Sequence, residues 1–570
     1  MKLTGLIFMS ILFQVIFIAL SPAQEKKSGM SENISSLNPY AASTFECSGI
    51  YWKIPDAGAC KIKYKELKST SWKNGMDLIY DSRDGEYRGS IIGLKPDTDY
   101  EAELFVSSLK TQLKFRTRND KFPVGKKTIL PAGESDKTIV INESGTPAGY
   151  HLVTVPQDNK SVLNLKNVYE NGIEIDADYV IVSGIEIRNA ARDGIRIKKG
   201  RHDVVVEQCN ITFWGGIGGP LTYGNLGGGS AIYAEEGTSN LTLQRNLMED
   251  PRGAANDWET GHPVGPQGIS IWQSLGGNVI RYNDVVSTED HGFNDAIGGG
   301  QNRSMTGNVN RDSDIYGNLI RSVWDDAIES EGGNMNVRIW GNYMHFFFNG
   351  IATASVSKGP IYIYRNVMGE SRRGHRNPTG GSMFKTGDLN EFGGGLRLIF
   401  HNTAVQPGGV YNVIGRDPHC ITRNNIFNVP GNLGPDTETP PLSSYDYDFF
   451  PSRAPEGQET HGYTTRLSPA GGRILVSSYK LEFYPRSSIN SVTIGRFPFK
   501  FGEREVNITD PVFSVKSPLI DTGIILQGFN DDFKGSAPDL GAFEVGNPPL
   551  EFGRRAYMKY NEGWAPWERY

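Results

Sequence analysis

Residues 172–175 read Gly-Ile-Glu-Ile, and this pattern of a small residue, an isoleucine and two further residues recurs six times along the chain. The later copies begin at residues 194, 231, 268, 296, 327 and 350. A second pattern puts an asparagine beside an apolar residue about every 24 or 36 residues, at positions 210, 246, 283, 318, 342, 366, 402 and 425. A repeat of this length is typical of a solenoid, whose coils bury their apolar faces against one another.

The repeat predicts a parallel β-helix rather than another solenoid. Leucine-rich repeats share the length but not the residue pattern, and a propeller, the alternative, has longer repeats near 40 residues. Asparagine tolerates left-handed turns, where stacked side chains can bond along the solenoid axis. We therefore expect an all-β chain whose main domain, residues 128–548, is a right-handed parallel β-helix, followed by a tail at 549–570.

The composition of the 570-residue chain excludes several classes of protein. It holds 68 Gly and 31 Pro, and its 38% hydrophobic and 11% aromatic residues are too many for a disordered chain. Charged residues make up only 21%, which disfavours a coiled coil, and the net charge is −6. We expect neither nucleic acid nor an anionic membrane as a partner, and we expect a monomer.

The N-terminus has the features of a cleavable signal peptide. Lys2 precedes an apolar run from Leu6 to Leu20, and small residues follow near Ala23. The run is shorter than the roughly 20 residues that span a membrane, so an anchor is the less favoured alternative. We expect residues 1–23 to be removed and the protein to be secreted, periplasmic or at the cell surface.

Four cysteines give no metal-binding pattern. Cys47 and Cys60 are close enough in sequence to form a disulfide in an exported protein. Cys209 and Cys420 lie in strand-like segments, where we expect them to be small buried residues. No spacing of cysteine or histidine suggests zinc.

Residues 40–118 predict a small separate module. Short segments alternate apolar and polar residues, and a Pro96-Asp97 turn precedes Tyr100 and another alternating segment. This stretch resembles a fibronectin type III domain, which implies a β-sandwich with a tyrosine corner. Such modules usually serve as spacers or contact sugar surfaces.

The C-terminal part suggests the biology. A Pro-rich stretch at 430–455 is expected to form a surface excursion, and Asp510-Pro511-Val512-Phe513 and residues 537–544 follow. This order resembles the closing coils of secreted bacterial β-helix proteins that degrade polysaccharides, including fucan- and carrageenan-type hydrolases. The resemblance covers roughly 128–548 and implies a polysaccharide substrate without specifying the reaction.

Stacking the copies of the repeat predicts which side chains share a groove. Parallel strands stack about 4.8 Å apart, and the residue after each isoleucine points outward. That column reads Glu174, Arg196, Tyr233, Ser270, Gly298, Glu329, Ala352, Lys385 and Tyr411. The next outward column reads Asp176, Lys198, Glu235, Trp272, Gly300, Glu331 and Ala354.

These columns have the composition of a sugar-binding groove. Tyr233 and Trp272 are expected to be platforms for sugar rings. Gly298, Gly299 and Gly300 on one side, and Ala352 and Ala354 on the other, are expected to clear space around Glu329 and Glu331.

Asp295 and Asp326 occupy equivalent positions before two successive strands and are expected to lie roughly 5 Å apart. Two such carboxylates repel, so one pKa should rise, which supplies an acid and a base for glycoside hydrolysis. A separation near 5 Å suits a retaining mechanism, and a wider pair such as Asp295 with Glu329 an inverting one. The alternative is that both aspartates cap turns.

We assign catalytic candidates from this region and substrate-binding candidates around it. The catalytic candidates are Asp295, Asp326, Glu329, His291 and Lys385, with a plain loop histidine as the alternative for His291. The binding candidates are Tyr233, Trp272, Asp325, Glu331, Arg372, Arg373, His375, Arg376 and Tyr411. The arginine-rich run suits carboxylate and sulfate groups, although a solvated loop would look the same.

The prediction is a secreted glycoside hydrolase that cleaves an anionic polysaccharide, such as a sulfated fucan. A polysaccharide lyase is the main alternative, with a base and a neutralising cation drawn from Lys385, Tyr411, Arg373 and His291. Lyases often use Ca²⁺, and Asp312 and Asp314 offer oxygen ligands, but no calcium-loop spacing is present and no metal ligand is assigned. A non-catalytic carbohydrate-binding protein is the third alternative.

Overall fold

The computed structural model describes residues 38–557 with internal gaps. The signal peptide at 1–23, most of the Pro-rich stretch and the chain beyond 557 lie outside the described residues. The gaps are 157–158, 217–228, 253–256, 259–265, 289–290, 300–301, 375–379, 388–392, 407, 415–418, 428–442, 451–459, 465–473, 476–480, 486–498, 502–503, 507–508, 514–518 and 549.

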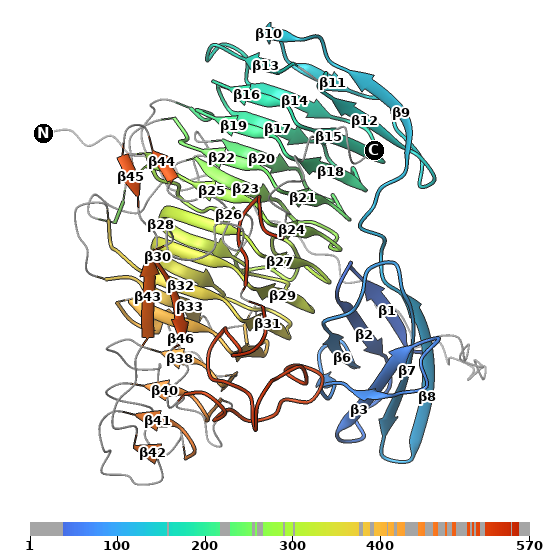
Figure 1. Ribbon diagram of the computed structural model, residues 1–570. Helices are drawn as coiled ribbons and strands as arrows, with labels where there is room; N and C mark the ends of the chain where they lie inside the picture. The colour runs from blue at the N-terminus through green and yellow to red at the C-terminus, as the bar shows by residue number, and fades with distance from the viewer. Residues whose placement is uncertain are drawn as a thin grey trace, which may run out of the picture.

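The main domain is a right-handed parallel β-helix with three faces, each a stack of short parallel strands (Figure 1). Within the described part of the chain, no helix is long and apolar enough to cross a membrane. Face A comprises β10 (Gly133–Ser135), β13 (Ser161–Asn164), β16 (Glu186–Arg188), β19 (Asn210–Thr212), β22 (Leu247–Glu249), β25 (Asp284–Val286), the first halves of β28 (Leu319–Glu329) and β30 (Tyr343–Ala352), β32 (Val367–Glu370), β35 (Thr403–Gln406), β38 (Ile426–Phe427), β40 (Phe449–Phe450), β41 (Tyr463–Thr464) and β42 (Ile474–Leu475).

Face B carries the predicted groove. It comprises β11 (Ile139–Ile141), β14 (Asn171–Ile175), β17 (Asp193–Ile197), β20 (Ser230–Ala234), β23 (Gln267–Ile271), β26 (Ile297–Gly298), the second halves of β28 and β30, β33 (Ser382–Gly387) and β36 (Tyr411–Ile414). Face C comprises β9 (Val124–Ile129), β12 (Tyr150–Thr154), β15 (Val180–Ser183), β18 (Val204–Glu207), β21 (Thr242–Gln244), β24 (Val279–Arg281), β27 (Asp314–Tyr316), β29 (Val337–Trp340), β31 (Ile361–Tyr364), β34 (Arg397–Phe400), β37 (Cys420–Arg423) and β39 (Ser444–Tyr445).

The register on face B confirms the predicted isoleucine column. Ile173, Ile195, Ile232, Ile269 and Ile297 are successive partners, and Ile328 and Ile351 continue the column. All seven are at most 1% exposed and belong to the single core that runs through the solenoid. Because side chains alternate along a strand, the residue after each isoleucine faces outward.

The predicted asparagine ladder forms and is internally hydrogen-bonded. The Nδ2 of Asn318 donates to the Oδ1 of Asn342 at 3.0 Å, and the Nδ2 of Asn342 donates to Asn366 at the same distance. Each amide also donates to a backbone carbonyl of an earlier coil. The ladder consists of Asn246, Asn283, Asn318, Asn342, Asn366, Asn402 and Asn425, and it ends at Asp448.

The placement of Asn210 in this ladder is wrong by one residue. Asn210 pairs with Leu247 in the register, so the position before Asn246 is Cys209. The backbone N–H of Cys209 donates to the Oδ1 of Asn246, and Cys209 is fully buried. The side chain of Asn210 instead accepts a hydrogen bond from Arg554.

Residues 40–116 form two small antiparallel sheets that face one another across their own core. One sheet contains β1 (Tyr40–Ser43), β2 (Ser48–Trp52), β5 (Ile79–Asp81) and β6 (Glu86–Ile91); the other contains β3 (Cys60–Glu66), β4 (Lys73–Asn74), β7 (Asp99–Val106) and β8 (Leu109–Arg116). The hydroxyl of Tyr100 accepts a hydrogen bond from the backbone N–H of Lys95, the contact expected of a tyrosine corner.

The expected disulfide between Cys47 and Cys60 is wrong, because both thiols are free and buried. Cys60 lies in the core of the sandwich, whereas Cys47 belongs to a separate apolar cluster between the sandwich and face C. Their side chains therefore point into different cores. Burial raises the pKa of the Cys60 thiol to about 12.

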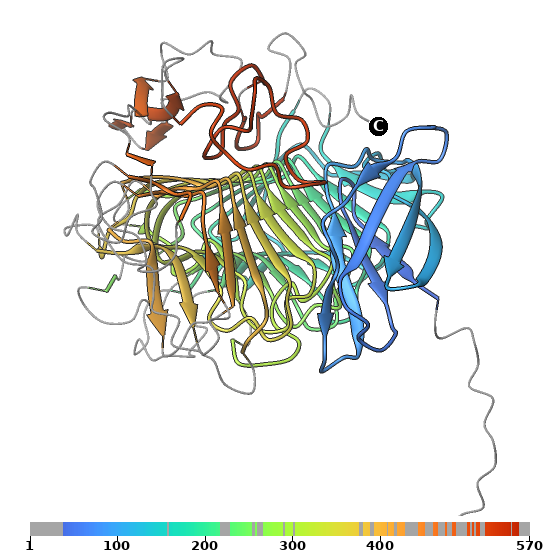
Figure 2. The ribbon, with the colours of Figure 1, turned by 90° about the horizontal axis from the view of Figure 1, so that it is seen from below.

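The sandwich packs against face C beside β27, β29 and β31 (Figures 1 and 2). Asp314 ion-pairs with Arg338 at 2.6 Å and accepts a hydrogen bond from Thr44 of the sandwich. Asp312 accepts one from the hydroxyl of Tyr51 at 2.8 Å. The two aspartates considered as calcium ligands therefore hold the two domains together instead.

The chain after the last coils does not add the closing coils expected for residues 510–544. β46 (Thr509–Phe513) pairs antiparallel with β43 (Leu481–Pro485), and β44 (Phe499–Phe501) pairs antiparallel with β45 (Arg504–Val506). Residues 519–557 then run back along the solenoid, as the red segment in Figure 2 shows. Gly541 bonds to Asn424, whereas Arg554 reaches Asn210, so this strap spans many coils.

Candidate active site

Five carboxyl groups gather where β26 and β28 lie side by side on face B. We call Asp295, Asp325, Asp326, Glu329 and Glu331 the carboxylate cluster; each is at most 8% exposed. One oxygen each from Asp295, Asp325 and Asp326 lies within 4.8 Å of the other two. The same holds for Asp326, Glu329 and Glu331.

Asp295 and Asp326 stack as the repeat predicts. Each lies two residues before a paired isoleucine, and the backbone N–H of Asp326 donates to the Oδ1 of Asp295 at 3.2 Å. Side-chain amides hold both carboxyl groups. Gln267 and Asn294 donate to the Oδ2 of Asp295 at 2.8 and 2.9 Å, and Asn349 donates to the Oδ1 of Asp326 at 2.8 Å.

These three amides were not identified in the sequence, although two of them belong to a readable column. The position two residues before each inward residue reads Asp193, Ser230, Gln267, Asp295, Asp326, Asn349 and Ser382. Extending the Asp295–Asp326 comparison by one coil on each side would have found Gln267 and Asn349.

Lys385 reaches this cluster from two coils away. Its Nζ lies 2.8 Å from the Oδ2 of Asp326 and 3.2 Å from the Oε1 of Glu331. Ala352 occupies the coil between Glu329 and Lys385, and its small side chain leaves room for the lysine. Burial lowers the pKa of Lys385, but the surrounding carboxylates outweigh burial and hold the pKa well above its usual value. The lysine is therefore a resident cation.

Glu329 fills the space that the glycines were expected to leave open. A Cβ added at Gly298 would lie 2.6 Å from the Cβ of Glu329, so the glutamate packs directly on this glycine. The backbone N–H of Gly299 donates to the Oε2 of Glu329 at 3.0 Å. The expectation of an emptied floor at Gly298 and Gly299 is therefore wrong, and Gly300 lies outside the described residues.

Glu331 is the most deeply buried member of the cluster. Its Oε1 accepts hydrogen bonds from Lys385 and from the backbone N–H of Ala354, at 3.3 Å from the latter. Its Oε2 is buried without a hydrogen-bond partner. Burial raises the pKa of Glu331 to about 8, because Lys385 offsets only part of the desolvation cost.

The remaining acids respond to the same two causes. Burial, followed by the carboxylates of Glu329 and Asp325, raises the pKa of Asp295 well above its ordinary value. Burial and then Asp326 do the same to the pKa of Asp325, and burial also raises the pKa of Glu329. A buried group that holds its proton near neutral pH can serve as a general acid.

Trp258 extends the site toward the loop after β22. Its indole N–H donates to the Oδ1 of Asp325 at 3.3 Å, and its ring centre lies 5.1 Å from that of Phe348. The sequence offered this tryptophan as a sugar platform or a packing residue, without its bond to Asp325. Since 253–256 and 259–265 are not described, only Trp258 and Asp257 represent this part of the loop.

The platform candidates lie further along face B. Tyr233 is half-buried under the guanidinium of Arg196, 4.6 Å from its ring centre, and three coils separate it from Glu329. Trp272 is half-buried and lies two coils from Glu331 in the second outward column. At about 4.8 Å per coil, both lie at the distance of flanking sugars rather than at the cluster.

Two other candidates are not brought to the cluster. Tyr411 pairs with Phe384, not with Lys385, so it continues the inward column and packs against the core. Its assignment to the outward column is wrong by one residue. His291 is half-buried, and its Nδ1 lies 3.1 Å from the carbonyl oxygen of Pro251.

The basic loop contributes less positive charge than expected. Arg372 ion-pairs with Glu370 at 2.7 Å and lies 3.6 Å over the ring of Phe346. Arg373 is exposed and donates to the carbonyl oxygen of Trp258 at 3.4 Å. His375 and Arg376 lie outside the described residues.

The two acidic triads of the cluster have the ligand type that Ca²⁺ prefers. The triad of Asp326, Glu329 and Glu331 already contacts the ammonium of Lys385, which would repel a second cation. All four oxygens of Asp295 and Asp326 already accept hydrogen bonds from amides, the backbone or Lys385. These residues do not fit a resident divalent cation, and no step is routed through one.

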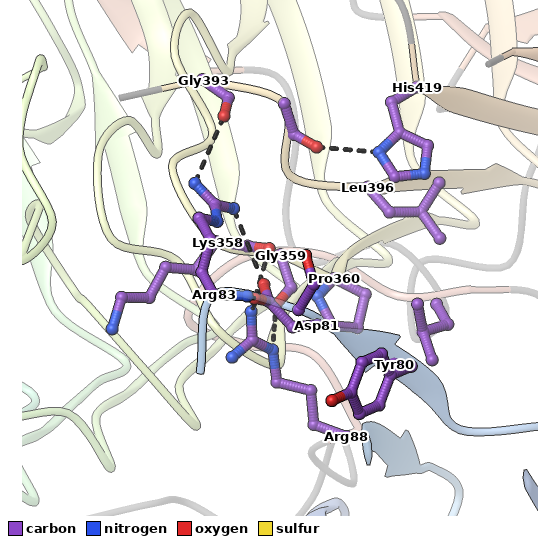
Figure 3. Close-up of a pocket in the computed structure, with 13 residues that line it drawn as sticks. Tyr80, Asp81, Arg83, Arg88, Lys358, Gly359, Pro360, Gly393, Leu396 and His419 are labelled. Atoms are coloured by element: carbon purple, nitrogen blue, oxygen red, sulfur yellow. Dashed lines mark hydrogen bonds and ion pairs between the residues drawn. The ribbon is translucent and has the colours of Figure 1, made fainter. Parts of the chain in front are cut away.

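A separate cavity of about 420 Å³ lies at the junction of the sandwich and the solenoid (Figure 3). Its charged groups are paired: Arg88 binds Asp81 and the backbone of Gly359, and Arg83 reaches the carbonyl oxygen of Gly393. His419 bonds to Gly394. These contacts connect the two domains and leave the cavity without the acid–base pair that the cluster has.

The fold and site together define a parallel β-helix protein with a buried carboxylate cluster on one face. No model of a known protein family matches this sequence, and no curated protein matches it. Among solved structures, an alginate lyase from Paenibacillus sp. is similar over 62% of this chain and 92% of its own, at 13% identity and a TM-score of 0.31.

Two further solved structures are similar at comparable levels. A periplasmic alginate epimerase matches 52% of this chain and 78% of its own, at 10% identity and a TM-score of 0.28. The catalytic domain of a GH87 α-1,3-glucanase in complex with nigerose matches 76% of this chain and 92% of its own, at 12% identity and a TM-score of 0.27. The strand register establishes the fold of this chain, and its chemistry is argued from its own residues.

Proposed function

We propose that this protein hydrolyses glycosidic bonds of a polysaccharide at the carboxylate cluster. The observation that carries the proposal is the stack of Asp295 on Asp326, with oxygens within 4.8 Å and with amide donors fixing both groups. Two closely spaced carboxyl groups in different environments are the apparatus of glycoside hydrolysis.

The environments assign different roles to the two aspartates. Asp295 keeps its proton because burial and its acidic neighbours raise its pKa, so it protonates the departing glycosidic oxygen. Asp326 contacts the ammonium of Lys385 and attacks the anomeric carbon as a carboxylate, which forms a glycosyl ester. Asp295 then takes a proton from water, the hydroxide attacks the same carbon, and Asp326 is released.

The spacing supports retention of the anomeric configuration. Retaining glycosidases hold their two carboxyl groups about 5–5.5 Å apart, whereas inverting enzymes need about 6.5–9.5 Å to admit a water molecule. The separation of at most 4.8 Å between oxygens belongs to the first class.

The same geometry disfavours β-elimination, the main alternative. A lyase needs a base that is free to take a proton from carbon. Lys385 is clamped between Asp326 and Glu331 with a raised pKa, and Tyr411 packs toward the core. The candidates named for elimination are therefore committed to structural contacts.

The test is to incubate the protein without its first 23 residues with neutral, carboxylated and sulfated polysaccharides. We expect new reducing ends without the ultraviolet absorbance of an unsaturated product, and proton NMR should show the configuration of the cleaved linkage retained. Unsaturated products would replace hydrolysis by elimination. A complete panel without cleavage would leave only the carbohydrate-binding alternative.

A further inference from the structure

The carboxylate cluster and its surroundings contain more hydrogen-bond acceptors than donors. Three buried acceptor oxygens in or beside it have no partner: the Oε2 of Glu331, the Oδ1 of Asn294 and the Oδ1 of Asn308. Asn294 donates to Asp295, and Asn308 donates to the backbone of Glu329, so both amides border the cluster. Buried acceptors without donors are costly, so a ligand that supplies donors is favoured here.

The charge of the cluster has the same sign as this imbalance. Five carboxyl groups share one lysine, and the other amine or guanidinium closest in sequence, Arg372, is paired with Glu370. A carboxylate or a sulfate is an acceptor without a donor and adds negative charge. At about 5 Å and an effective dielectric constant near 20, one added negative charge beside one carboxylate lowers affinity about 100-fold.

We propose that the sugar ring bound at the carboxylate cluster is uncharged: it presents hydroxyl groups and carries neither carboxylate nor sulfate. This inference rests on the proposed function, because it places the cleaved sugar at the cluster. Hydroxyl groups donate as well as accept, so they satisfy the free oxygens of Glu331, Asn294 and Asn308 where an acidic group would be repelled. Acidic groups of the polymer are confined to flanking sugars, where the exposed Arg373 borders the site.

The first experiment uses matched polymers on the protein without its signal segment. Alginate and polygalacturonate carry a carboxylate on every ring, and each is compared with its carboxyl-reduced form, which keeps the linkage. Sulfated fucan and carrageenan are compared with their desulfated forms, alongside neutral glucan, galactan and mannan. For every polymer that is cut, mass spectrometry identifies the sugar at the new reducing end.

We expect an uncharged sugar at every new reducing end, and cleavage of reduced or desulfated forms at least 100-fold faster than that of the uniformly charged parents. A carboxylated or sulfated sugar at the new reducing end overturns the inference and leaves hydrolysis standing. If no polymer is cut, the proposed hydrolysis fails. The inference is then judged by calorimetric titration of neutral and charged oligosaccharides, and tighter binding of the charged ones overturns it.

A variant pair tests the cause of the discrimination. Glu331→Gln replaces an unpartnered acceptor with a donor and removes a negative charge, so it should reduce the preference for uncharged sugars about tenfold. Glu235→Gln, in the same outward column three coils away, is the matched control and should keep the full preference. Equal preference in both variants would separate the discrimination from the cluster.

Discussion

The asparagine ladder and the carboxylate cluster are two stacks of buried polar side chains in the same solenoid. In the ladder, Asn342 accepts from one neighbour and donates to the next, at 3.0 Å in both directions. In the cluster, Asp295 and Asp326 only accept, and their donors come from amides, the backbone and Lys385. Both stacks arise from one repeat, yet only the first satisfies itself.

The difference follows from the chemistry of the two side chains. An amide has a donor and an acceptor, so identical amides can bond along a parallel stack without limit. A carboxylate has only acceptors, so a buried stack of carboxylates requires protons, a cation or a ligand. The ladder therefore stabilises the fold, whereas the cluster stores the unfavourable interactions that raise the pKa of Asp295, Asp325, Glu329 and Glu331.

The largest expected effect is the loss of the proposed acid. Asp295→Asn should reduce kcat by about 10³-fold, within the 10²–10⁴ range of general acid catalysis, because the amide cannot protonate the leaving oxygen. Steady-state kinetics on the best polymer measure this change. Asp193→Asn is the matched control, since Asp193 is buried in the same column but pairs with Arg196. An equal loss in both variants would contradict a catalytic role for Asp295.

Converting a ladder residue into a cluster-like residue should destabilise the fold. Asn342→Asp removes the donors to Ile315 and Asn366 and buries a charge, so we expect a loss of about 3 kcal/mol of unfolding free energy. Urea denaturation at neutral pH provides the measurement. The activity of the molecules that remain folded should be unchanged. A stability equal to that of the wild type would show that the ladder bonds contribute little.

The cluster should make stability depend on pH in a defined direction. Burial raises the pKa of Glu331 from 4.5 to about 8, so the native state binds a proton that the unfolded state releases between these values. The unfolding free energy should therefore fall as pH rises from about 5 to 8. Glu331→Gln removes this contribution, and its Tm should gain about 3 °C on the wild type across this range. Calorimetric scans that stay parallel would contradict the shift.

The smallest expected effect concerns the pH profile of activity. After burial, the Glu329 carboxylate is the largest cause that raises the pKa of Asp295. Glu329→Gln should therefore lower the pKa of Asp295 and move the alkaline limb of kcat/KM to lower pH, by about one pH unit. The profile of Glu235→Gln serves as the reference. A limb that moves to higher pH would mean that Asp295 is not the titrating acid.

Periodicity made the solenoid, its inward column and the stack of Asp295 on Asp326 predictable, because a repeat fixes which residues are neighbours. It failed where the spacing varies. In the coil of Tyr411, the inward residue lies 14 rather than 15 residues before Asn425, and this one residue turns Tyr411 inward. In the same way, Cys209 takes the ladder position assigned to Asn210.

Contacts outside the repeat were not predictable from it. Lys385 was placed in the outward column, but its reach over Ala352 to Asp326 depends on side-chain direction. Asp312 and Asp314 face the sandwich because that domain covers face C, which no spacing within the solenoid indicates. The returning strap at 519–557 is likewise a tertiary contact.

The end of the ladder has a consequence for how the chain can change in length. Each asparagine passes a hydrogen bond forward, and Asp448 receives the last one from Asn425 with no N–H of its own to pass on. Asp448 thus works as a punctuation mark. A whole coil duplicated before it would join the sentence unchanged, whereas a coil copied after it would begin with an acceptor facing an acceptor. The solenoid can be lengthened from within, and its last word is already written.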